Sequence, residues 1–246
     1  MDPHAYRAFT DELRERAAAD DRVVGLVAVG SMAQQDYRSD RWSDHDFLLI
    51  ARDGAQEELR RDLSWLPRAG EIALSFRETA HGLKVLYRDG HLLEFAVFDL
   101  EELGVASIDR YRVLLDRGGV ESRVREVRAR PSHEPTDEYL FGQLVTNAQV
   151  AIGRTARGEV LSGAFFLTSA KRHLCALVAR HVRSENRNLL DPFDPLRRFE
   201  RAYPELGAEI AAAGPGELLR IAQRALGAVR PDLAWAALEA VLLEQA

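Results

Sequence analysis

The first half of the chain is organised as short apolar runs and alternating segments, a pattern typical of strands. The apolar run 23–29 (VVGLVAV) and the run 46–52 (DFLLIAR) are predicted as buried strands. Strands are also predicted at 71–77, 82–88 and 91–98, and the pair Asp89-Gly90 indicates a hairpin turn between the last two. A further short run, YRVLLD, ends at Arg117-Gly118-Gly119.

Two segments of this half have helical spacing instead. Residues 3–19 form a charged amphipathic pattern that opens with Pro3, and residues 54–66 repeat leucines at helical intervals before Pro67. The first half is therefore predicted to be an α/β (α+β) domain with a mixed sheet.

The second half changes character from Thr136 onward, where apolar residues recur at intervals of three and four. The clearest predicted helices are 137–159, 164–182, 216–229 and 232–245, with breaks at Gly158, 188–195, 203–207 and 213–217. The segment 128–138 (RARPSHEPTDE) contains two prolines and is the natural boundary. Two domains are expected: an α/β domain at 1–130 and an all-α helical bundle at 131–246.

Composition narrows the classes of function. A hydrophobic content of 46% is enough for a proper core. A net charge of −6 argues against a long nucleic-acid partner, because binding to phosphate backbones usually leaves a basic footprint. The single cysteine, Cys175, excludes an intrachain disulfide and is expected in the helical core. The start has no apolar leader and no stretch is long enough to span a membrane, so a soluble cytoplasmic protein is expected.

The first candidate for chemistry is Gly30-Ser31, directly after the strand at 23–29. Glycine permits a sharp turn and the close approach of a ligand, and Ser31 stands where a helix N-cap would. Free amides at such a turn attract phosphate. Neither a P-loop nor a GxGxxG pattern is present, and Gly-Ser alone favours a capped helix that binds no ligand.

The second candidate is Asp44-His45-Asp46, at the start of the next strand. Alternate residues of a strand face the same side, so the two carboxylates stand side by side, where they repel each other. Mg²⁺ would relieve that repulsion, since it binds one or two carboxylates together with phosphate oxygens and water. The alternative is that Asp44 is an ordinary turn residue and Asp46 lies at a solvated edge of the sheet.

The third candidate is Glu94, inside the apolar strand 91–98. If that strand lies beside the strand at 46–52, three acids converge, which suits a pair of metal ions in phosphoryl transfer. Glu94 could instead act as the general base for a substrate hydroxyl, or form an ordinary buried ion pair.

Together these residues resemble the nucleotidyltransferase superfamily related to DNA polymerase β. Its signature is a hydrophobic residue followed by Gly-Ser, a spacer, and Asp-x-Asp leading a strand; Val29-Gly30-Ser31 and Asp44-His45-Asp46-Phe47 match it. His45 departs mildly from the apolar residue preferred between the aspartates, and its side chain should point away from the metals. An α/β domain followed by a helical bundle is similar to the antibiotic nucleotidyltransferases, which modify aminoglycosides and lincosamides.

The resemblance implies transfer of a nucleoside monophosphate, usually AMP from ATP, to a hydroxyl group, with release of pyrophosphate. It implies that Asp44 and Asp46 bind two Mg²⁺ ions and that Glu94 is the base or completes the metal shell. Gly30 and Ser31 would hold the triphosphate. Arg38, Ser43 and Lys171 are further candidates for nucleotide binding.

The resemblance leaves other functions open. Small relatives act as antitoxins that nucleotidylate a protein, although the helical half argues for a domain that binds a small acceptor. A relative that only binds nucleotide is the other alternative. A homodimer is expected, because relatives often pair so that both chains line the site.

Overall fold

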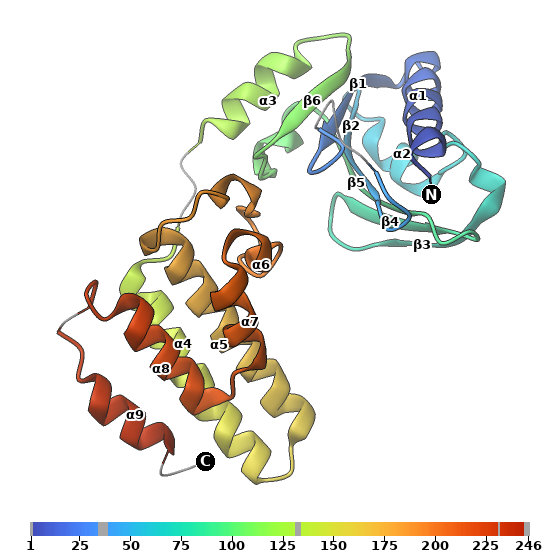
Figure 1. Cartoon of the computed structure of the whole chain (residues 1–246). Coiled ribbons are helices and arrows are strands. Elements are labelled where there is room, and N and C mark those ends of the chain that lie inside the picture. Colours follow the sequence, from blue (N-terminus) through green and yellow to red (C-terminus); the bar gives the residue numbers. More distant parts are fainter. Residues whose placement is uncertain (1, 34–38, 131–133, 231, 244–246) are drawn as a thin grey trace. The chain divides into compact units, whose positions relative to one another are not determined.

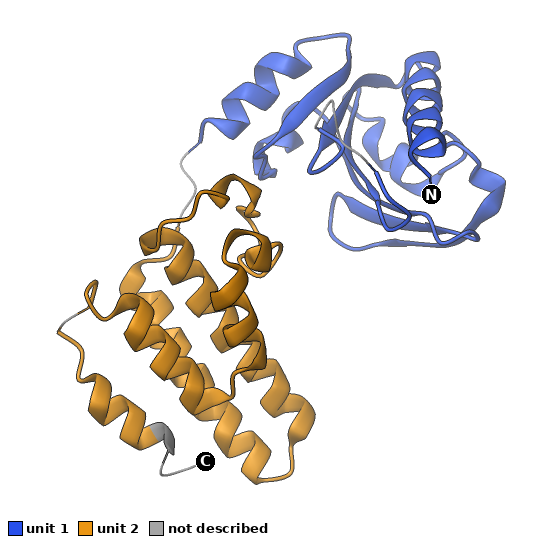
Figure 2. Ribbon diagram, in the orientation of Figure 1, with its two compact units in different colours: residues 1–132 blue, residues 133–246 orange. Residues whose placement is uncertain are grey.

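The structure is a computed structural model that describes residues 2–33, 39–130, 134–230 and 232–243. The chain divides into two compact units, residues 1–132 and 133–246 (Figure 2). The division falls within the Pro-containing segment 128–138. Each unit is described by itself.

Unit 1 is built on a six-stranded mixed sheet in the order β3-β4-β5-β2-β1-β6 (Figure 1). Only the central pair, β2 and β5, runs parallel; the other neighbouring strands are antiparallel. The strands are β1 Val23–Val29, β2 His45–Ala51, β3 Ile72–Arg77, β4 Gly82–Tyr87, β5 Leu92–Phe98 and β6 Tyr111–Asp116.

The two faces of the sheet are covered by different helices. The helix α1 (Pro3–Ala19) packs with Phe47, Leu49 and Phe95 on one face, and the segment that follows α2 (Gln56–Arg61) joins the same core. The helix α3 (Val120–Arg128) packs with Ile50 and Phe98, which belong to the other face. Short 3₁₀ turns at Ala69–Glu71 and Glu102–Val105 complete the unit.

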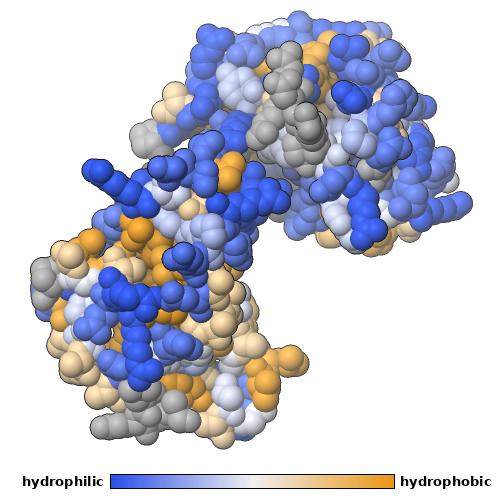
Figure 3. Space-filling model, in the orientation of Figure 1, coloured by the Kyte–Doolittle hydropathy of each residue, from blue (hydrophilic) through white to orange (hydrophobic). Residues whose placement is uncertain are grey.

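Unit 2 is helical. Its two longest helices, α4 (Asp137–Ala156) and α5 (Val160–His181), run antiparallel and are joined at Gly158. The positive φ of 78° at Gly158 allows a tight turn at the break that was predicted there. Cys175 is buried in this core, as expected. Figure 3 shows more hydrophobic surface on this unit than on unit 1. The helices are α4 Asp137–Ala156, α5 Val160–His181, α6 Phe199–Ala202, α7 Pro204–Ala212, α8 Pro215–Leu226 and α9 Trp235–Leu243, with a 3₁₀ turn at Arg187–Leu189.

The predicted fold class is confirmed: a mixed α/β sheet domain is followed by a helical part. Three details differ from the sequence prediction. The helix α2 ends at Arg61, because Asp62 is extended and its carboxylate accepts from the Ser64 amide. The helix α3 was not predicted. The predicted break at 203–207 is narrower than expected, because it consists of Tyr203 between α6 and α7, and α7 begins at Pro204. Among the described residues, no helix has the length and apolarity needed to cross a bilayer.

Candidate active site

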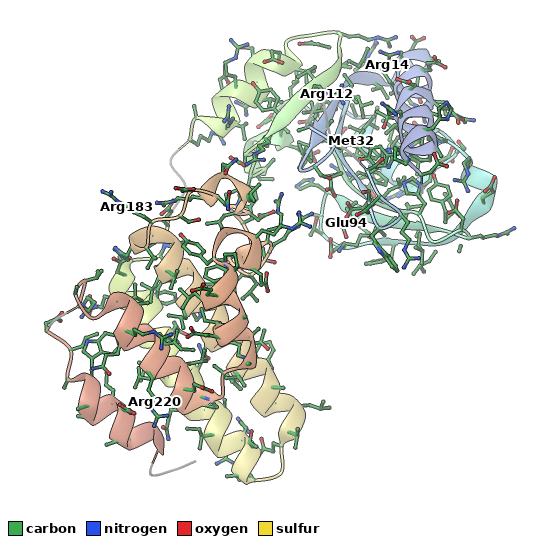
Figure 4. All side chains as sticks on the ribbon, viewed as in Figure 1. Arg14, Met32, Glu94, Arg112, Arg183 and Arg220 are labelled. Atoms are coloured by element: carbon green, nitrogen blue, oxygen red, sulfur yellow. The ribbon has the colours of Figure 1, made fainter. Side chains whose placement is uncertain are left out.

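Asp46 and Glu94 are direct neighbours across the parallel strands β2 and β5. They are partners in the strand register, so their side chains leave the sheet on the same face. The sequence predicted convergence of the acids if these two strands were neighbours, and they are neighbours. Both residues are half-buried, and Asp46 has further interactions of its own. The position of Glu94 is labelled in Figure 4.

Gly30 brings the Gly-Ser turn against Asp46. Its φ is +57°, a left-handed conformation that favours glycine, and a Cβ added there would lie 2.8 Å from Asp46 Oδ2. The end of β1 and the start of β2 therefore meet, and any side chain at residue 30 would displace the carboxylate. The two halves of the sequence pattern, Gly30-Ser31 and Asp44-His45-Asp46, therefore lie next to each other in space.

Ser31 follows in the same turn. Its hydroxyl oxygen is buried and has no hydrogen-bond partner among the described residues. Buried polar atoms are normally paired, so this hydroxyl is available to a ligand. Residues 31–33 form a turn, and the segment 34–38, in which the helix after Ser31 was expected to continue, lies outside the described residues. Arg38 lies in that segment.

The residues around Asp44 tie the aspartate pair to α1. Tyr6 donates its phenolic hydroxyl to the backbone carbonyl of Asp44 at 3.0 Å. His45 turns to the opposite face, as expected, where it is fully buried and its ring stacks on Tyr6 at 3.8 Å. Its Nδ1 lies 2.8 Å from His91 Nε2, and its Nε2 lies 2.9 Å from Thr10 Oγ1.

This histidine pair is neutral at physiological pH. Burial lowers the pKa of His45 to about 3 and that of His91 to about 4. A neutral imidazole can both donate and accept one hydrogen bond, so the pair forms an internal support behind the aspartates. His91 thus contacts His45 behind the aspartates.

Glu94 has a cationic partner that sequence reasoning missed. Lys84 lies opposite it on β4, and its Nζ is 2.9 Å from Glu94 Oε1 and 3.0 Å from Glu78 Oε1. The two carboxylates, chiefly Glu94, raise the pKa of Lys84. The sequence did offer one indication of Lys84, because Lys84 and Lys171 are the only lysines in the chain.

The remaining candidates have local partners. The Ser43 hydroxyl accepts from the Asp40 amide at 2.9 Å and closes a turn before Asp44; Ser43 has other interactions as well. Lys171, on α5 of unit 2, donates from Nζ to the Ala211 carbonyl at 2.7 Å, near the end of α7.

The donor chemistry of the site fits Mg²⁺. Within the described ranges, no three His, Cys, Asp or Glu side chains are grouped closely enough to hold a metal by themselves. Mg²⁺ does not require such a group, because one or two carboxylates with substrate phosphates and water are its usual ligands in enzymes of phosphate chemistry. Asp44 and Asp46 supply hard oxygen donors beside a turn suited to phosphate.

Comparison with protein families gives one clear finding. The model of the family described as streptomycin adenylyltransferase matches residues 5–187. This range is well over half of the chain, and it includes every candidate site residue from Gly30 to Lys171.

Comparison with solved structures gives weaker resemblances. An aminoglycoside 6-adenyltransferase from Bacillus subtilis is 11% identical at a TM-score of 0.30, over 97% of this chain and 91% of that one. The Bradyrhizobium diazoefficiens CD-NTase CdnG, in complex with GTP, is 15% identical at a TM-score of 0.31, over 100% and 94%. Scores this low support no conclusion about this chain. A search of curated proteins gave no significant match.

Proposed function

Because the chain belongs to the streptomycin adenylyltransferase family, it is an adenylyltransferase, and we propose that it moves AMP from ATP to a hydroxyl group of a small molecule. The observation that carries this proposal is the contact of the two motif halves. Gly30 approaches Asp46, and Asp46 is the register partner of Glu94. A turn that would bind phosphate and two carboxylates that would bind metal therefore lie next to Glu94, the proposed base.

Asp44 and Asp46 would hold two Mg²⁺ ions together with the phosphates of ATP. When bound, the metal neutralises charge on the phosphates during the transfer. The free amides of the turn and the unpartnered hydroxyl of Ser31 would bind phosphate oxygens. Arg38, Ser43 and Lys171 remain further proposed contacts of the nucleotide, on the strength of the resemblance.

Glu94 would take the proton of the acceptor hydroxyl. The freed oxygen attacks the α-phosphorus and forms the new P–O bond, while the bond to the bridging α–β oxygen breaks and pyrophosphate leaves. Lys84 would hold the Glu94 carboxylate in place through its 2.9 Å contact. Tyr6 would fix the backbone of Asp44.

The acceptor is proposed to be an antibiotic of the aminoglycoside or lincosamide class. The description of the family names streptomycin, which makes it the first acceptor to test. Unit 2 would supply the acceptor-binding domain. The protein would use nucleotide and small acceptor in solution, without long nucleic acid or membrane, and we propose a homodimer.

The test is incubation of the whole chain with ATP, Mg²⁺ and a panel of aminoglycosides and lincosamides, followed by mass spectrometry. We expect one class of acceptor to gain the mass of AMP, with release of pyrophosphate. Asp44→Ala and Asp46→Ala should abolish the gain, whereas Asp89→Ala, in the β4–β5 turn, should retain it. Label on a co-purifying protein, with none on any small molecule, would contradict the small-acceptor proposal.

A further inference from the structure

A second feature of unit 1 lies on the same face of the sheet as Glu94, on the side away from the Gly-Ser turn. The side chains of Leu74, Phe76 and Leu86 are 53%, 47% and 37% exposed there. Together with the half-buried Leu92 they form an apolar surface on β3, β4 and β5, which we call the β3–β4 ledge. No role proposed above uses it.

The strand register places the ledge directly beside the carboxylates of the candidate active site. Asp46 on β2 is the register partner of Glu94 on β5, which is also the partner of Lys84 on β4. Lys84 is in turn the partner of Phe76 on β3. Register partners point to the same face and neighbouring strands lie about 4.8 Å apart, so Phe76 stands about 10 Å from Glu94 across the sheet. An acceptor whose hydroxyl reaches Glu94 therefore has the ledge as its neighbouring surface.

The ledge continues in the next row of the sheet, which consists of leucines. Leu92, Leu86 and Leu74 are register partners across β5, β4 and β3, and β3 is the edge of the sheet (Figure 1). A sheet face that meets only water normally carries polar residues. Within the described ranges, however, the residues of the ledge belong to none of the hydrophobic cores. An uncovered apolar surface of this kind marks a place where a ligand or partner binds.

The side of the ledge nearest the active site carries more negative than positive charge. The ammonium group of Lys84 lies between two carboxylates, 2.9 Å from Glu94 Oε1 and 3.0 Å from Glu78 Oε1. These three groups form a cluster of two anions and one cation. A ligand that brings one amino group would balance the cluster, so charge complementarity favours a basic acceptor over an acidic one.

We infer that the β3–β4 ledge binds an amino-sugar ring of the acceptor, with the C–H face of the ring on Phe76 and Leu86 and its amino group toward Glu78. This inference rests on the proposed function, because it assigns part of the acceptor in that reaction. A sugar ring is apolar on the face formed by its C–H groups and carries hydroxyl and amino groups around its rim. That combination matches an apolar surface bordered by carboxylates, and an aromatic side chain supplies a large share of the contact area.

The test measures binding of two amino-sugar glycosides, streptomycin and kanamycin, by calorimetry with the whole chain and without ATP. We expect at least one of them to bind. Phe76→Ala should raise its Kd about tenfold, because the apolar contact area of the ring is lost, whereas Phe76→Tyr, which keeps the ring, should retain the affinity. Glu78→Gln should also weaken binding, because the cluster loses one negative charge.

Val105→Ala is the matched control, because it removes apolar area from a side chain that is 71% exposed in the turn Glu102–Val105. It should leave the Kd unchanged. Phe76 is itself half-exposed on an edge strand and belongs to no core of the described residues, so Phe76→Ala should keep the thermal midpoint of the wild type.

Three results would overturn the inference: no binding of either glycoside, an unchanged Kd in Phe76→Ala, or an equal loss in Val105→Ala. Sedimentation of the same variants covers the other possible occupant of the ledge. If Phe76→Ala turned a dimer into a monomer and left the Kd unchanged, the ledge would be a contact between two copies instead. The binding needs no turnover, so a wild-type chain that binds a glycoside through Phe76 but transfers no AMP would contradict the proposed function alone.

Discussion

The contact between Gly30 and Asp46 predicts the effect of a single added methyl group. Gly30→Ala forces a non-glycine residue into φ of +57°, which costs about 1–2 kcal/mol of folding free energy. The new Cβ would also lie 2.8 Å from Asp46 Oδ2, so the carboxylate has to move. Because misplacing a reacting group by about 1 Å can cost 10²-fold in rate, a smaller shift should lower kcat by at least about tenfold.

Gly90→Ala separates strain from displacement. Gly90 has a φ of +85° in the β4–β5 hairpin, and a Cβ there would meet nothing within 4 Å. Both variants should lower the thermal midpoint of unit 1 by roughly 3–10 °C, but only Gly30→Ala should slow AMP transfer. The assays are calorimetric unfolding and initial rates at saturating ATP. Wild-type rates in Gly30→Ala, or an equal loss in Gly90→Ala, would refute the reasoning.

Three further predictions concern other parts of the structure. Burial lowers the pKa of His91 from 6.5 to about 4, so the stability that depends on its neutral form is present above pH 6.5 and is lost as the pH falls toward 4, by about 3 kcal/mol at most. The free energy of unfolding, measured in urea from pH 7 to 4, should fall less steeply with decreasing pH in His91→Gln than in the wild type. An equal slope in the two proteins would contradict the prediction. Lys171→Ala should raise the KM for ATP roughly tenfold with little change in kcat, because one charge-assisted contact with the nucleotide is lost. An unchanged KM would contradict a nucleotide contact and would mean that Lys171 serves only to bind the Ala211 carbonyl. Trp42 is 77% exposed, whereas Trp65 and Trp235 are buried, so Mg²⁺–ATP at the neighbouring Asp44 should change quenching of tryptophan emission by iodide, and Trp42→Phe should remove that change. If the change in iodide quenching persisted in Trp42→Phe, it would arise from another tryptophan and would contradict the prediction.

The strands of unit 1 could be predicted because each is short, apolar and bounded by turn residues. The hairpin at Asp89-Gly90 forms as expected, with Gly90 at positive φ. The pairing of β5 with β2 could only be posed as a condition, because neighbours in a sheet are set by packing over long sequence distances. That pairing decides whether Glu94 stands near the aspartates, so it was the step that the sequence could not supply.

Other features of the site were hidden because they depend on side chains from distant elements. The sequence left an ion pair of Glu94 open but did not identify the partner, which is Lys84, on a strand that becomes a neighbour only in the folded sheet. The helix α3 was missed for a different reason, because it is short and has charged residues at most exposed positions. Its three buried valines, Val120, Val124 and Val127, do recur at helical intervals, so the signal was present in the sequence.

The most direct test of the account uses ATP labelled with ³²P at the α-phosphate, together with Mg²⁺ and streptomycin. The central claim is that the Gly-Ser turn and the aspartate pair form one site for transfer of AMP, with Asp46 at its centre. The account predicts label on the acceptor with the wild-type chain and none with Asp46→Asn, a variant of nearly the same shape. Equal labelling by Asp46→Asn would contradict it.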